Sequence, residues 1–244
     1  MRKGRPMADE GQRLSKVVAA QVPCSRREAE QYITEGRVRV DGRVVEQPQF
    51  RVADGQRVEV ESRERLQPVQ PVTFLVHKPA GMRGGDVQGL LADASHWSGD
   101  TSGIRRVKSH LAGLTALLPL PTPASGLTVL SQDRGVIRKL TQDAAFVERE
   151  FVVEVTGALA NHGLEKLGRG MVTDDGVLPP ARVSWQSEAR LRFAGKGIVP
   201  DAVPWMCEQV GLTVTAVKCL RIGRIAMGGL PPGQWRYLPP GERF

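Results

Sequence analysis

Apolar residues in the first sixty positions follow a helical spacing twice and then an alternating one. The residues spaced to form the apolar faces of two short helices are Leu14, Val17 and Val18, then Ala29, Tyr32 and Ile33. Ser25 is predicted to begin the second helix, because Glu28 three residues later completes a capping box. Gly36 can end this helix in a left-handed turn.

Two pairs of strands are predicted after these helices. Residues 37–40 alternate between basic and apolar side chains, and Asp41-Gly42 is a type I′ hairpin signal. Residues 49–52 and 58–60 then flank a second turn signal, Asp54-Gly55. Two helices and four short strands form a unit that ends near residue 61.

Basic side chains stand where these predicted elements meet. Arg26 and Arg27 fall in the first turn of the second helix, where free backbone N–H groups and the positive end of the helix dipole favour a phosphate. The net charge of +8 and the pI of about 9.9 also favour a polyanionic partner. A helical hairpin with ordinary surface charge is the alternative interpretation.

The order of these signals from Arg13 to about Val60 resembles the small RNA-binding domain first described in ribosomal small-subunit protein S4. In that family the matching positions hold structured RNA. The resemblance implies that RNA is contacted by Arg13, Lys16, Ser25, Arg26, Arg27 and Arg37.

The rest of the chain predicts a second domain of the α+β class. Residues 62–71 are charged and contain two prolines, which is typical of a linker. From residue 72 onward, short alternating segments indicate many antiparallel strands with a few helices between them. We therefore expect a disordered N-terminus at 1–12, an RNA-binding domain at 13–61, the linker at 62–71, and the α+β domain at 72–244.

Several classes of site are not expected from the composition. The cysteines, Cys24, Cys207 and Cys219, are too few and too scattered for a zinc cluster, and the histidines show no metal-ligand spacing. No segment is long and apolar enough to span a membrane. We expect a cytoplasmic monomer without metal or cofactor.

From Val72 to Glu242 the order of short motifs is similar to the ribosomal RNA pseudouridine synthases that carry an S4-type domain in front, the large-subunit enzymes above all. The motifs are HKPAG (77–81), SGL (125–127), REFVV (149–153), LPPARV (178–183), LRIG (220–223) and GQWRYL (233–238). The resemblance implies a mixed or antiparallel sheet and ribosomal RNA as partner. It also implies a flipped uridine that packs on an aromatic ring, here Phe151. Lys78 resembles a family position near the rim of the site, where it would contact RNA; a plain surface lysine is the alternative interpretation.

The catalytic motif of that family is degenerate in this chain. The family pattern begins Gly-Arg-Leu-Asp, and the matching stretch reads LPLPTPASGL (118–127), so Pro121 stands at the position of the nucleophilic aspartate. A proline has no side-chain oxygen and cannot act as a nucleophile. Loss of the nucleophile costs other enzymes about a millionfold in rate.

Other positions of the expected site have changed as well. Pro119 replaces the motif's arginine, Phe151 replaces a tyrosine, and Asp201, Pro204 and Trp205 replace basic residues near the C-terminus. A buried cation without its carboxylate is costly, so a site that lost the anion is expected to lose the cation too.

We interpret the chain as an RNA-binding protein on a pseudouridine synthase scaffold that is catalytically impaired, with no catalytic residue assigned. The alternative is an active ribosomal RNA pseudouridine synthase in which another carboxylate serves, with Asp100 and Asp201 as candidates. A third interpretation is a protein-binding scaffold, against which the cluster Arg26, Arg27 and Arg37 argues.

Overall fold

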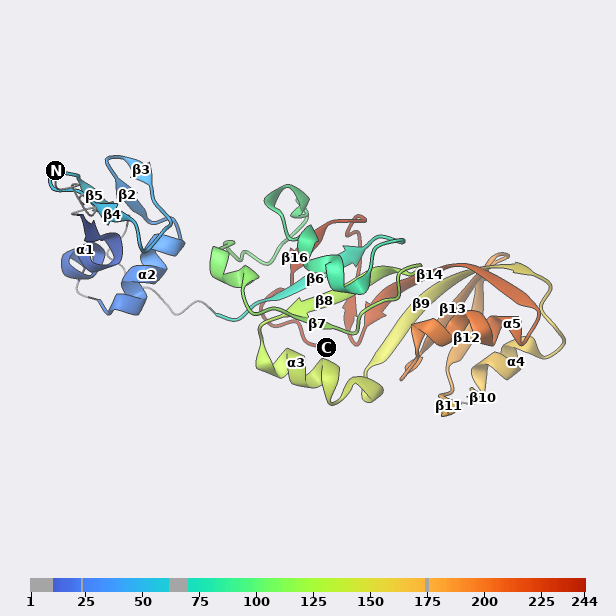
Figure 1. Ribbon diagram of the computed structural model, residues 1–244. Helices are drawn as coiled ribbons and strands as arrows, with labels where there is room; N and C mark the ends of the chain where they lie inside the picture. Colours follow the sequence, from blue (N-terminus) through green and yellow to red (C-terminus); the bar gives the residue numbers. More distant parts are fainter. Residues whose placement is uncertain (1–10, 23, 62–69, 174–175) are drawn as a thin grey trace, which may run out of the picture. The chain divides into compact units, whose positions relative to one another are not determined.

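The computed structural model describes residues 11–22, 24–61, 70–173 and 176–244, which form two compact units (Figure 1). The first unit runs to Gln70 and includes Arg106–Ala112, and the second comprises Pro71–Arg105 and Gly113–Phe244. The disorder expected at residues 1–10 and most of the expected linker lie outside the described residues. Gln12, which we expected in the disordered segment, is part of a strand.

The first unit consists of two helices and short strands around a small core. Its elements are β1 (Gln12–Arg13), α1 (Leu14–Gln21), α2 (Arg26–Thr34), β2 (Val38–Val40), β3 (Arg43–Val44), β4 (Arg51–Val52), β5 (Val58–Val60) and the 3₁₀ helix η3 (Lys108–Leu111). The two predicted helices are confirmed, and their buried residues include Leu14, Val18, Ala29, Tyr32 and Ile33. Asp41 and Gly42 both have positive φ angles, as the type I′ turn requires.

The strand pairing of the first unit differs from the expected second hairpin. β4 pairs with β1, and β5 pairs with β2, so the strands on either side of Asp54-Gly55 do not pair with each other. β2 also pairs with β3, as predicted. The β1–β4 pair joins residues about forty positions apart, and the polar Gln12–Arg13 carries no alternating pattern that could indicate it.

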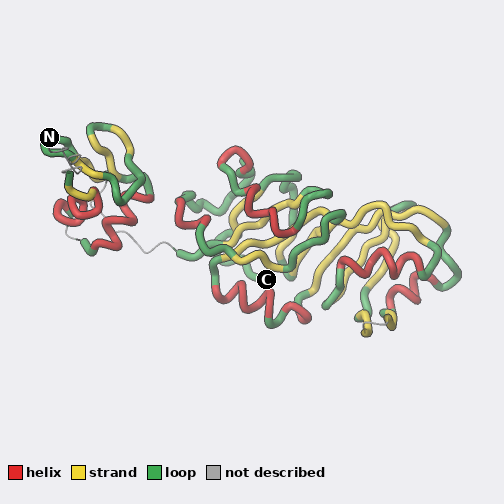
Figure 2. Tube along the Cα trace, in the orientation of Figure 1, coloured by secondary structure: helices red, strands yellow, loops and turns green. Residues whose placement is uncertain are grey.

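The second unit is built on one nine-stranded sheet, the long run of strands in Figure 2. Its strands are β6 (Thr73–Lys78), β7 (Thr115–Leu117), β8 (Ser125–Ser131), β9 (Glu148–Gly157), β12 (Arg182–Ser187), β13 (Arg190–Lys196), β14 (Leu212–Ile222), β15 (Ile225–Ala226) and β16 (Trp235–Tyr237). The order is β12-β13-β9-β14-β8-β6-β16, with β7 beside β8 and β15 beside β14. All pairs are antiparallel except β14 with β8, so the predicted α+β fold with a mixed sheet is confirmed.

Helices lie between the strands in sequence and pack against the sheet. They are η1 (Gly84–Leu90), η2 (Asp93–Ser95), α3 (Arg134–Thr141), η4 (Ala144–Phe146), α4 (Gly163–Gly168), η5 (Pro200–Ala202) and α5 (Val203–Glu208). α3 packs against β7 and β8, α4 against β12, and α5 against β14. A separate hairpin of β10 (Met171–Thr173) and β11 (Gly176–Leu178) completes the unit, and Asp174-Asp175 at its turn lies outside the described residues.

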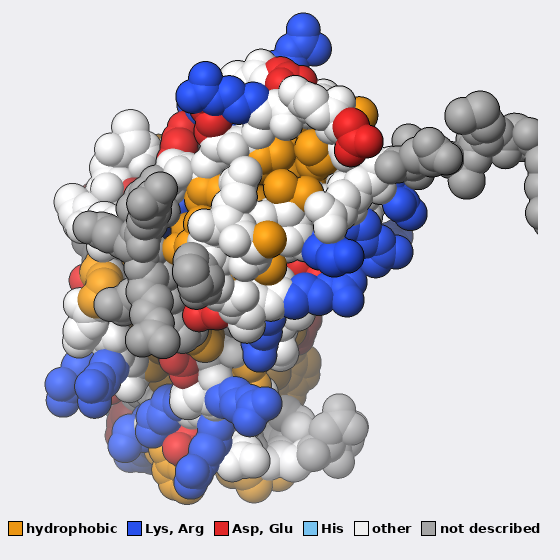
Figure 3. Space-filling view, turned by 90° about the vertical axis from the view of Figure 1, so that its left-hand side faces the viewer, with side chains coloured by type: hydrophobic (Ala, Val, Ile, Leu, Met, Phe, Trp, Pro, Cys, Tyr) orange, Lys and Arg blue, Asp and Glu red, His pale blue; other side chains and the backbone are white. Residues whose placement is uncertain are grey.

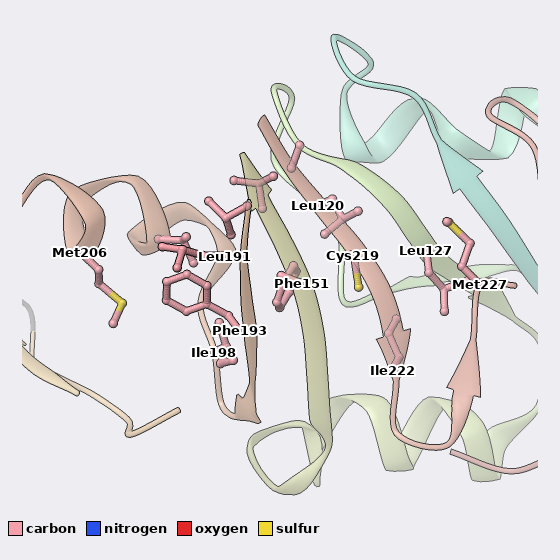
Figure 4. Packing of buried hydrophobic residues seen from close by; sticks show 14 of the residues in the cluster. Leu120, Leu127, Phe151, Leu191, Phe193, Ile198, Met206, Cys219, Ile222 and Met227 are labelled. Atoms are coloured by element: carbon pink, nitrogen blue, oxygen red, sulfur yellow. The ribbon is translucent and has the colours of Figure 1, made fainter. Parts of the chain in front are cut away.

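The core of the second unit lies along the middle of the sheet. In Figure 4, Phe151 occupies the centre of this cluster, with Phe193 and Leu191 on one side and Cys219 and Ile222 on the other. All five side chains are fully buried. Among the residues described, none of the helices has both the length and the apolar character needed to cross a lipid bilayer.

Candidate functional site

A basic hollow lies in the first unit between β1, α1, the start of α2 and β4. Its volume is about 490 Å³, and its lining residues are Gln12, Arg13, Ser15, Lys16, Ala19, Arg26 and Arg51. Four of these residues are cationic and none is acidic, so the hollow attracts an anion. It brings together three of the predicted RNA-binding residues, Arg13, Lys16 and Arg26.

Arg51 belongs to this hollow although the sequence interpretation did not include it. It stands directly opposite Arg13 in the β1–β4 pair, and its Nη1 donates to the carbonyl oxygen of Gly11 at 2.8 Å. Like charges directly opposite each other weaken a strand pair, so a ligand that neutralises both is favoured. The alternation of exposed Arg51 with buried Val52 was the signal that could have identified it.

The start of α2 is held by the predicted capping box, which is confirmed. Ser25 Oγ accepts a hydrogen bond from the backbone N–H of Glu28 at 3.2 Å, and Glu28 Oε2 accepts one from the N–H of Ser25 at 2.7 Å. This fixes the first turn of α2, from which Arg26 and Arg27 extend with exposed side chains. Arg26 also pairs with Glu30 at 3.2 Å, an exposed ion pair of small energy.

Arg27 and Arg37 do not line the hollow. Arg27 is exposed on α2, whereas Arg37 is half-buried with its Nε 3.0 Å from Glu35 Oε2. In Figure 3, Lys and Arg side chains form separate groups on the visible surface, with acidic and apolar side chains between them. The positive charge is therefore distributed, and the hollow is a local concentration of it.

In the second unit, Lys78 lies beneath the loop that contains Pro121. Its side chain is completely buried, and Nζ donates to the carbonyl oxygens of Pro79, Thr122 and Ala124 at 3.0, 3.2 and 2.7 Å. Burial lowers the pKa of this ammonium group. The resemblance placed Lys78 at the rim of the site in contact with RNA, but in the structure it holds the loop from inside.

The loop that contains Pro121 begins with a residue in a left-handed backbone conformation. Leu118 has a φ of +48°, a left-handed conformation that a leucine rarely adopts. The resemblance aligns this position with the glycine of the family motif. Leu120 is buried in the core, and Pro121 is half-buried with its carbonyl oxygen accepting from the N–H of Ala124 at 3.1 Å.

A row of directly paired residues connects this loop to Phe151. Gly126 pairs with Cys219, Cys219 with Phe151, and Phe151 with Phe193. Gly126 has a φ of +108°, and a Cβ atom there would collide with the backbone of Cys219. The glycine therefore allows β8 and β14 to approach where the loop enters the sheet. The ring of Phe151, expected to receive a base, has no exposed surface.

Arg149 lies two residues from Phe151 on the same strand face. Its guanidinium carbon lies 4.8 Å from the centroid of the Phe151 ring, and its side chain is 5% exposed. Burial lowers the pKa of this guanidinium, whereas its contact with the buried Cys219 thiol acts in the opposite direction. Within the described part of the chain neither Arg149 nor Lys78 forms an ion pair.

The two carboxylates considered as substitutes for the aspartate lie elsewhere. Asp100 accepts hydrogen bonds from the backbone N–H groups of Ser102 and Tyr237 at 2.8 and 2.9 Å, and its Oδ2 lies 2.8 Å from His96 Nε2. Burial raises the pKa of Asp100, but these hydrogen bonds outweigh it and the pKa is lowered. Tyr237 belongs to β16, four strands from Phe151 in the sheet order. Asp201 is exposed in η5.

The carboxylates next to Arg149 in the sequence point to the opposite face of β9. Glu148 pairs with Arg182 at 2.8 Å and with Arg221, and Glu150 pairs with Arg192 at 2.7 Å. These arginines hold the pKa of both carboxyls below the usual range. Across the described ranges, no group of three His, Cys, Asp or Glu residues could hold a metal ion.

Comparisons with protein families, known proteins and solved structures identify what the chain is similar to. The S4 domain model matches residues 12–58. A protein of Aquifex aeolicus (strain VF5), named an uncharacterized RNA pseudouridine synthase, is 27% identical over 235 residues, which cover 94% of each chain. The ribosomal large subunit pseudouridine synthase B of Bacillus subtilis (strain 168) is 27% identical over 240 residues, covering 95% of this chain and 93% of that protein.

A dual-specificity RNA pseudouridine synthase, RluF, of Escherichia coli (strain K12) is 23% identical over 237 residues, covering 97% of this chain and 78% of that protein. Among solved structures, a crystal structure of a pseudouridylate synthase has a TM-score of 0.57 at 17% identity. It covers 93% of this chain and 95% of that chain. At this identity the structural match supports the fold of both units.

Proposed function

Because the chain carries an S4 domain and is homologous over nearly its full length to RNA pseudouridine synthases, we propose that it binds RNA and does not isomerise uridine. The observation that carries this proposal is Pro121 at the position of the nucleophilic aspartate. Isomerisation breaks the bond from uracil N1 to the ribose and forms one from C5. A proline side chain supplies neither a nucleophile nor a proton for these steps.

The roles of the nearby candidate carboxylates and the burial of Phe151 support the loss of activity. Asp100 is used to tie its loop to β16, and Glu150 is used in ion pairs on the opposite face of the sheet. Phe151 is fully buried and belongs to the same core cluster as Leu120. A flipped base would have to displace these side chains to reach the ring.

The basic hollow supports the RNA-binding part of the proposal. Arg13, Lys16, Arg26 and Arg51 would contact successive phosphates or a single phosphate, and such contacts give affinity without reading the base sequence. Ribosomal large-subunit RNA is the proposed partner, because a full-length relative is named for that substrate. We propose that the protein acts as a monomer that occupies or helps to fold this RNA.

Salt-dependent binding to large-subunit RNA tests the hollow. Replacement of Arg13 or Arg51 with alanine should reduce the slope of log affinity against log salt by about 1, the value for one phosphate contact. Arg57→Ala is the matched control, because Arg57 is an exposed arginine of the same unit that pairs with Glu59 outside the hollow. Equal slopes for all three variants and the wild type would contradict the assignment.

Pseudouridine formation tests the catalytic part. Large-subunit RNA transcribed without modification is incubated with the full chain, and pseudouridine is then detected by a carbodiimide adduct that stops reverse transcription. We expect no stop beyond that of RNA alone, whereas the Bacillus subtilis relative serves as the positive control for the assay. Turnover by the wild-type chain would refute the proposal.

An active synthase is the second candidate function. The observation in its favour is homology to named synthases over nearly the whole chain rather than over the S4 domain alone. If turnover is found, Asp100→Asn and Asp201→Asn distinguish the two carboxylates that could replace the missing nucleophile. Loss of turnover in one of them would identify it.

A further inference from the structure

The large sheet presents a second face to solvent, opposite the one that holds Phe151. Helices α3, α4 and α5 contribute buried residues to the core cluster that contains Phe151, so they lie on the Phe151 face of the sheet. The other face of β9 carries Glu148, Glu150, Val152 and Glu154, which alternate with buried residues and keep contact with solvent. This second face is therefore accessible to a partner.

Six basic residues project from this second face. Residues directly opposite each other on neighbouring strands lie on the same face, so the pairing of β12, β13, β9 and β14 assigns each side chain. The residues that this pairing places with Glu148, Glu150 and Glu154 are the cations Arg182, Arg190, Arg192, Lys196, Lys218 and Arg221. Six cations against three carboxylates leave a surplus of three positive charges. Glu188 and Arg224, in the turns at the ends of these strands, add one charge of each sign. We call this surface the charged sheet face.

Ion pairs hold the arginines of the charged sheet face in place. Glu150 Oε1 and Oε2 accept from Arg192 at 2.7 and 2.9 Å, and Glu150 Oε2 also accepts from Arg221 at 3.0 Å. Each guanidinium group has five N–H donors, so these contacts leave others for a ligand. Lys196 and Lys218 form no ion pair with a described residue. Because the guanidinium groups are already ordered, a ligand that binds them loses little side-chain entropy.

The residue types of the charged sheet face favour a phosphate backbone over a protein or an unpaired base. Protein interfaces depend on buried aromatic or large apolar anchors, and single-stranded RNA binds largely by stacking on aromatic rings. The paired positions of this face contain no aromatic residue, and the largest apolar one is Val152. Trp185 of β12 pairs with Leu191 and so belongs to the Phe151 face. Double-stranded RNA is bound mainly through its shape, phosphates and hydroxyls, which this composition fits.

We propose that the charged sheet face is a second RNA-binding surface, which contacts the phosphates of double-stranded RNA without reading its sequence. Arg192 and Lys218 both pair with Val152, so they stand on either side of β9, about 10 Å apart. Lys196 lies further along β13, so the cations form an array that fits an extended polyanion better than a single phosphate. This inference rests on the proposed RNA binding and adds a surface in the second unit to the hollow in the first.

Acylation of lysines in the wild-type chain locates the bound RNA without any substitution. The probe is an RNA duplex of about 16 base pairs, the length that a double-stranded RNA-binding domain covers. At saturation it should protect Lys196 and Lys218 from an amine-reactive ester, as measured by mass spectrometry. Lys139 and Lys166, exposed on helices of the Phe151 face, should keep their reactivity. Unchanged reactivity of Lys196 and Lys218 would overturn the proposal.

Removal of the two lysines measures their contribution. The double variant Lys196→Ala/Lys218→Ala should reduce the slope of log affinity for the duplex against log salt by about 2, one for each phosphate contact. It leaves no carboxylate without its partner, so its unfolding midpoint should stay close to that of the wild type. Lys139→Ala/Lys166→Ala removes the same charge from the other face and should keep the wild-type slope. Equal slopes in the two double variants would contradict the assignment.

Further probes identify the class of partner. The affinity for a single strand of the same sequence should change less than about twofold in Lys196→Ala/Lys218→Ala. Equal losses for the duplex and the single strand would contradict the preference for double-stranded RNA. Protection of Lys196 and Lys218 by polyglutamate but not by the duplex would assign an acidic protein to this face instead.

The variants of the basic hollow separate this proposal from the proposed function. If Arg13→Ala and Arg51→Ala lower the salt slope but Lys196→Ala/Lys218→Ala does not, RNA binding by the first unit stands and the charged sheet face is excluded. If the wild-type chain binds no RNA at low salt, both proposals are refuted.

Discussion

The carboxylate of Glu150 joins three strands of the large sheet, and its removal should measurably weaken the second unit. From β9 it accepts two hydrogen bonds from Arg192 of β13, at 2.7 and 2.9 Å, and one from Arg221 Nε of β14 at 3.0 Å. The opposite face of these strands carries Phe151 and Cys219. Glu150→Gln keeps the shape of the side chain and removes its charge.

The magnitude follows from the pKa of this carboxyl. Hydrogen bonds from Arg192, and then from Arg221, lower the pKa of Glu150 from 4.5 to about 2 against the opposing effect of burial. At 1.36 kcal/mol per unit, this difference of roughly 2.5 units sets an upper limit of about 3.4 kcal/mol. The carboxylate is 14% exposed and its partners are 44% and 25% exposed, so solvent screening reduces the expected loss to about 2 kcal/mol.

The sign of the pH dependence follows from the same difference. The pKa in the folded state is lower than in the unfolded state, so the carboxylate stabilises the fold fully above pH 4.5. This contribution is lost as the pH falls from 4.5 toward 2. Glu150→Gln should therefore be less stable than the wild type at neutral pH, and the two proteins should converge as the pH falls through that window.

Denaturant unfolding at a series of pH values measures both effects. Glu154→Gln is the control, because Glu154 forms an ion pair with Arg190 at 2.8 Å but is 44% exposed, for which we expect a loss under about 1 kcal/mol. A loss at neutral pH no larger than that of Glu154→Gln would refute the reasoning. A difference between Glu150→Gln and the wild type that does not shrink in acid would refute it equally.

Four further substitutions test individual residues, each by denaturant unfolding of the full chain. Ser25→Ala removes the cap of α2 and should destabilise the first unit by about 1 kcal/mol; an unchanged midpoint for that unit would contradict the cap. Leu118→Gly should stay within about 1 kcal/mol of the wild type, because relief of the left-handed strain offsets lost packing, whereas the buried Leu117→Ala should lose about 3 kcal/mol. Lys78→Met should cost about 3 kcal/mol, since it leaves three carbonyls, that of Ala124 buried, without their charged donor; a neutral effect would show that water replaces it.

Local signals in the sequence predicted much of the fold. The capping box located the start of α2, and Asp41-Gly42 located a turn whose two residues have positive φ angles. The alternating segments after residue 72 predicted strands, and one of these strands is β9, in which every second residue from Arg149 to Val155 is buried. These features depend on residues a few positions apart, so the sequence contains their causes directly.

The features that were missed depend on contacts between distant residues. The partners of Lys78 are backbone carbonyls, which every residue has, so no side chain could have indicated that this lysine is buried. Arg51 joins the basic hollow through the pairing of β4 with β1, about forty residues away. The sequence also could not indicate that Arg149 lacks an ion pair, because the carboxylates beside it in sequence lie on the other face of the strand.

Arg13 of β1 faces Arg51 of β4, so dissolved salt should strengthen this strand pair and weaken RNA binding. Counter-ions screen the repulsion between Arg13 and Arg51, so raising their concentration should tighten the N-terminal strand against its neighbour. The same ions compete with these guanidinium groups for phosphate and weaken association with RNA. At low salt, a bound polyanion would therefore have its highest affinity for the basic hollow and would also stabilise the β1–β4 pair most.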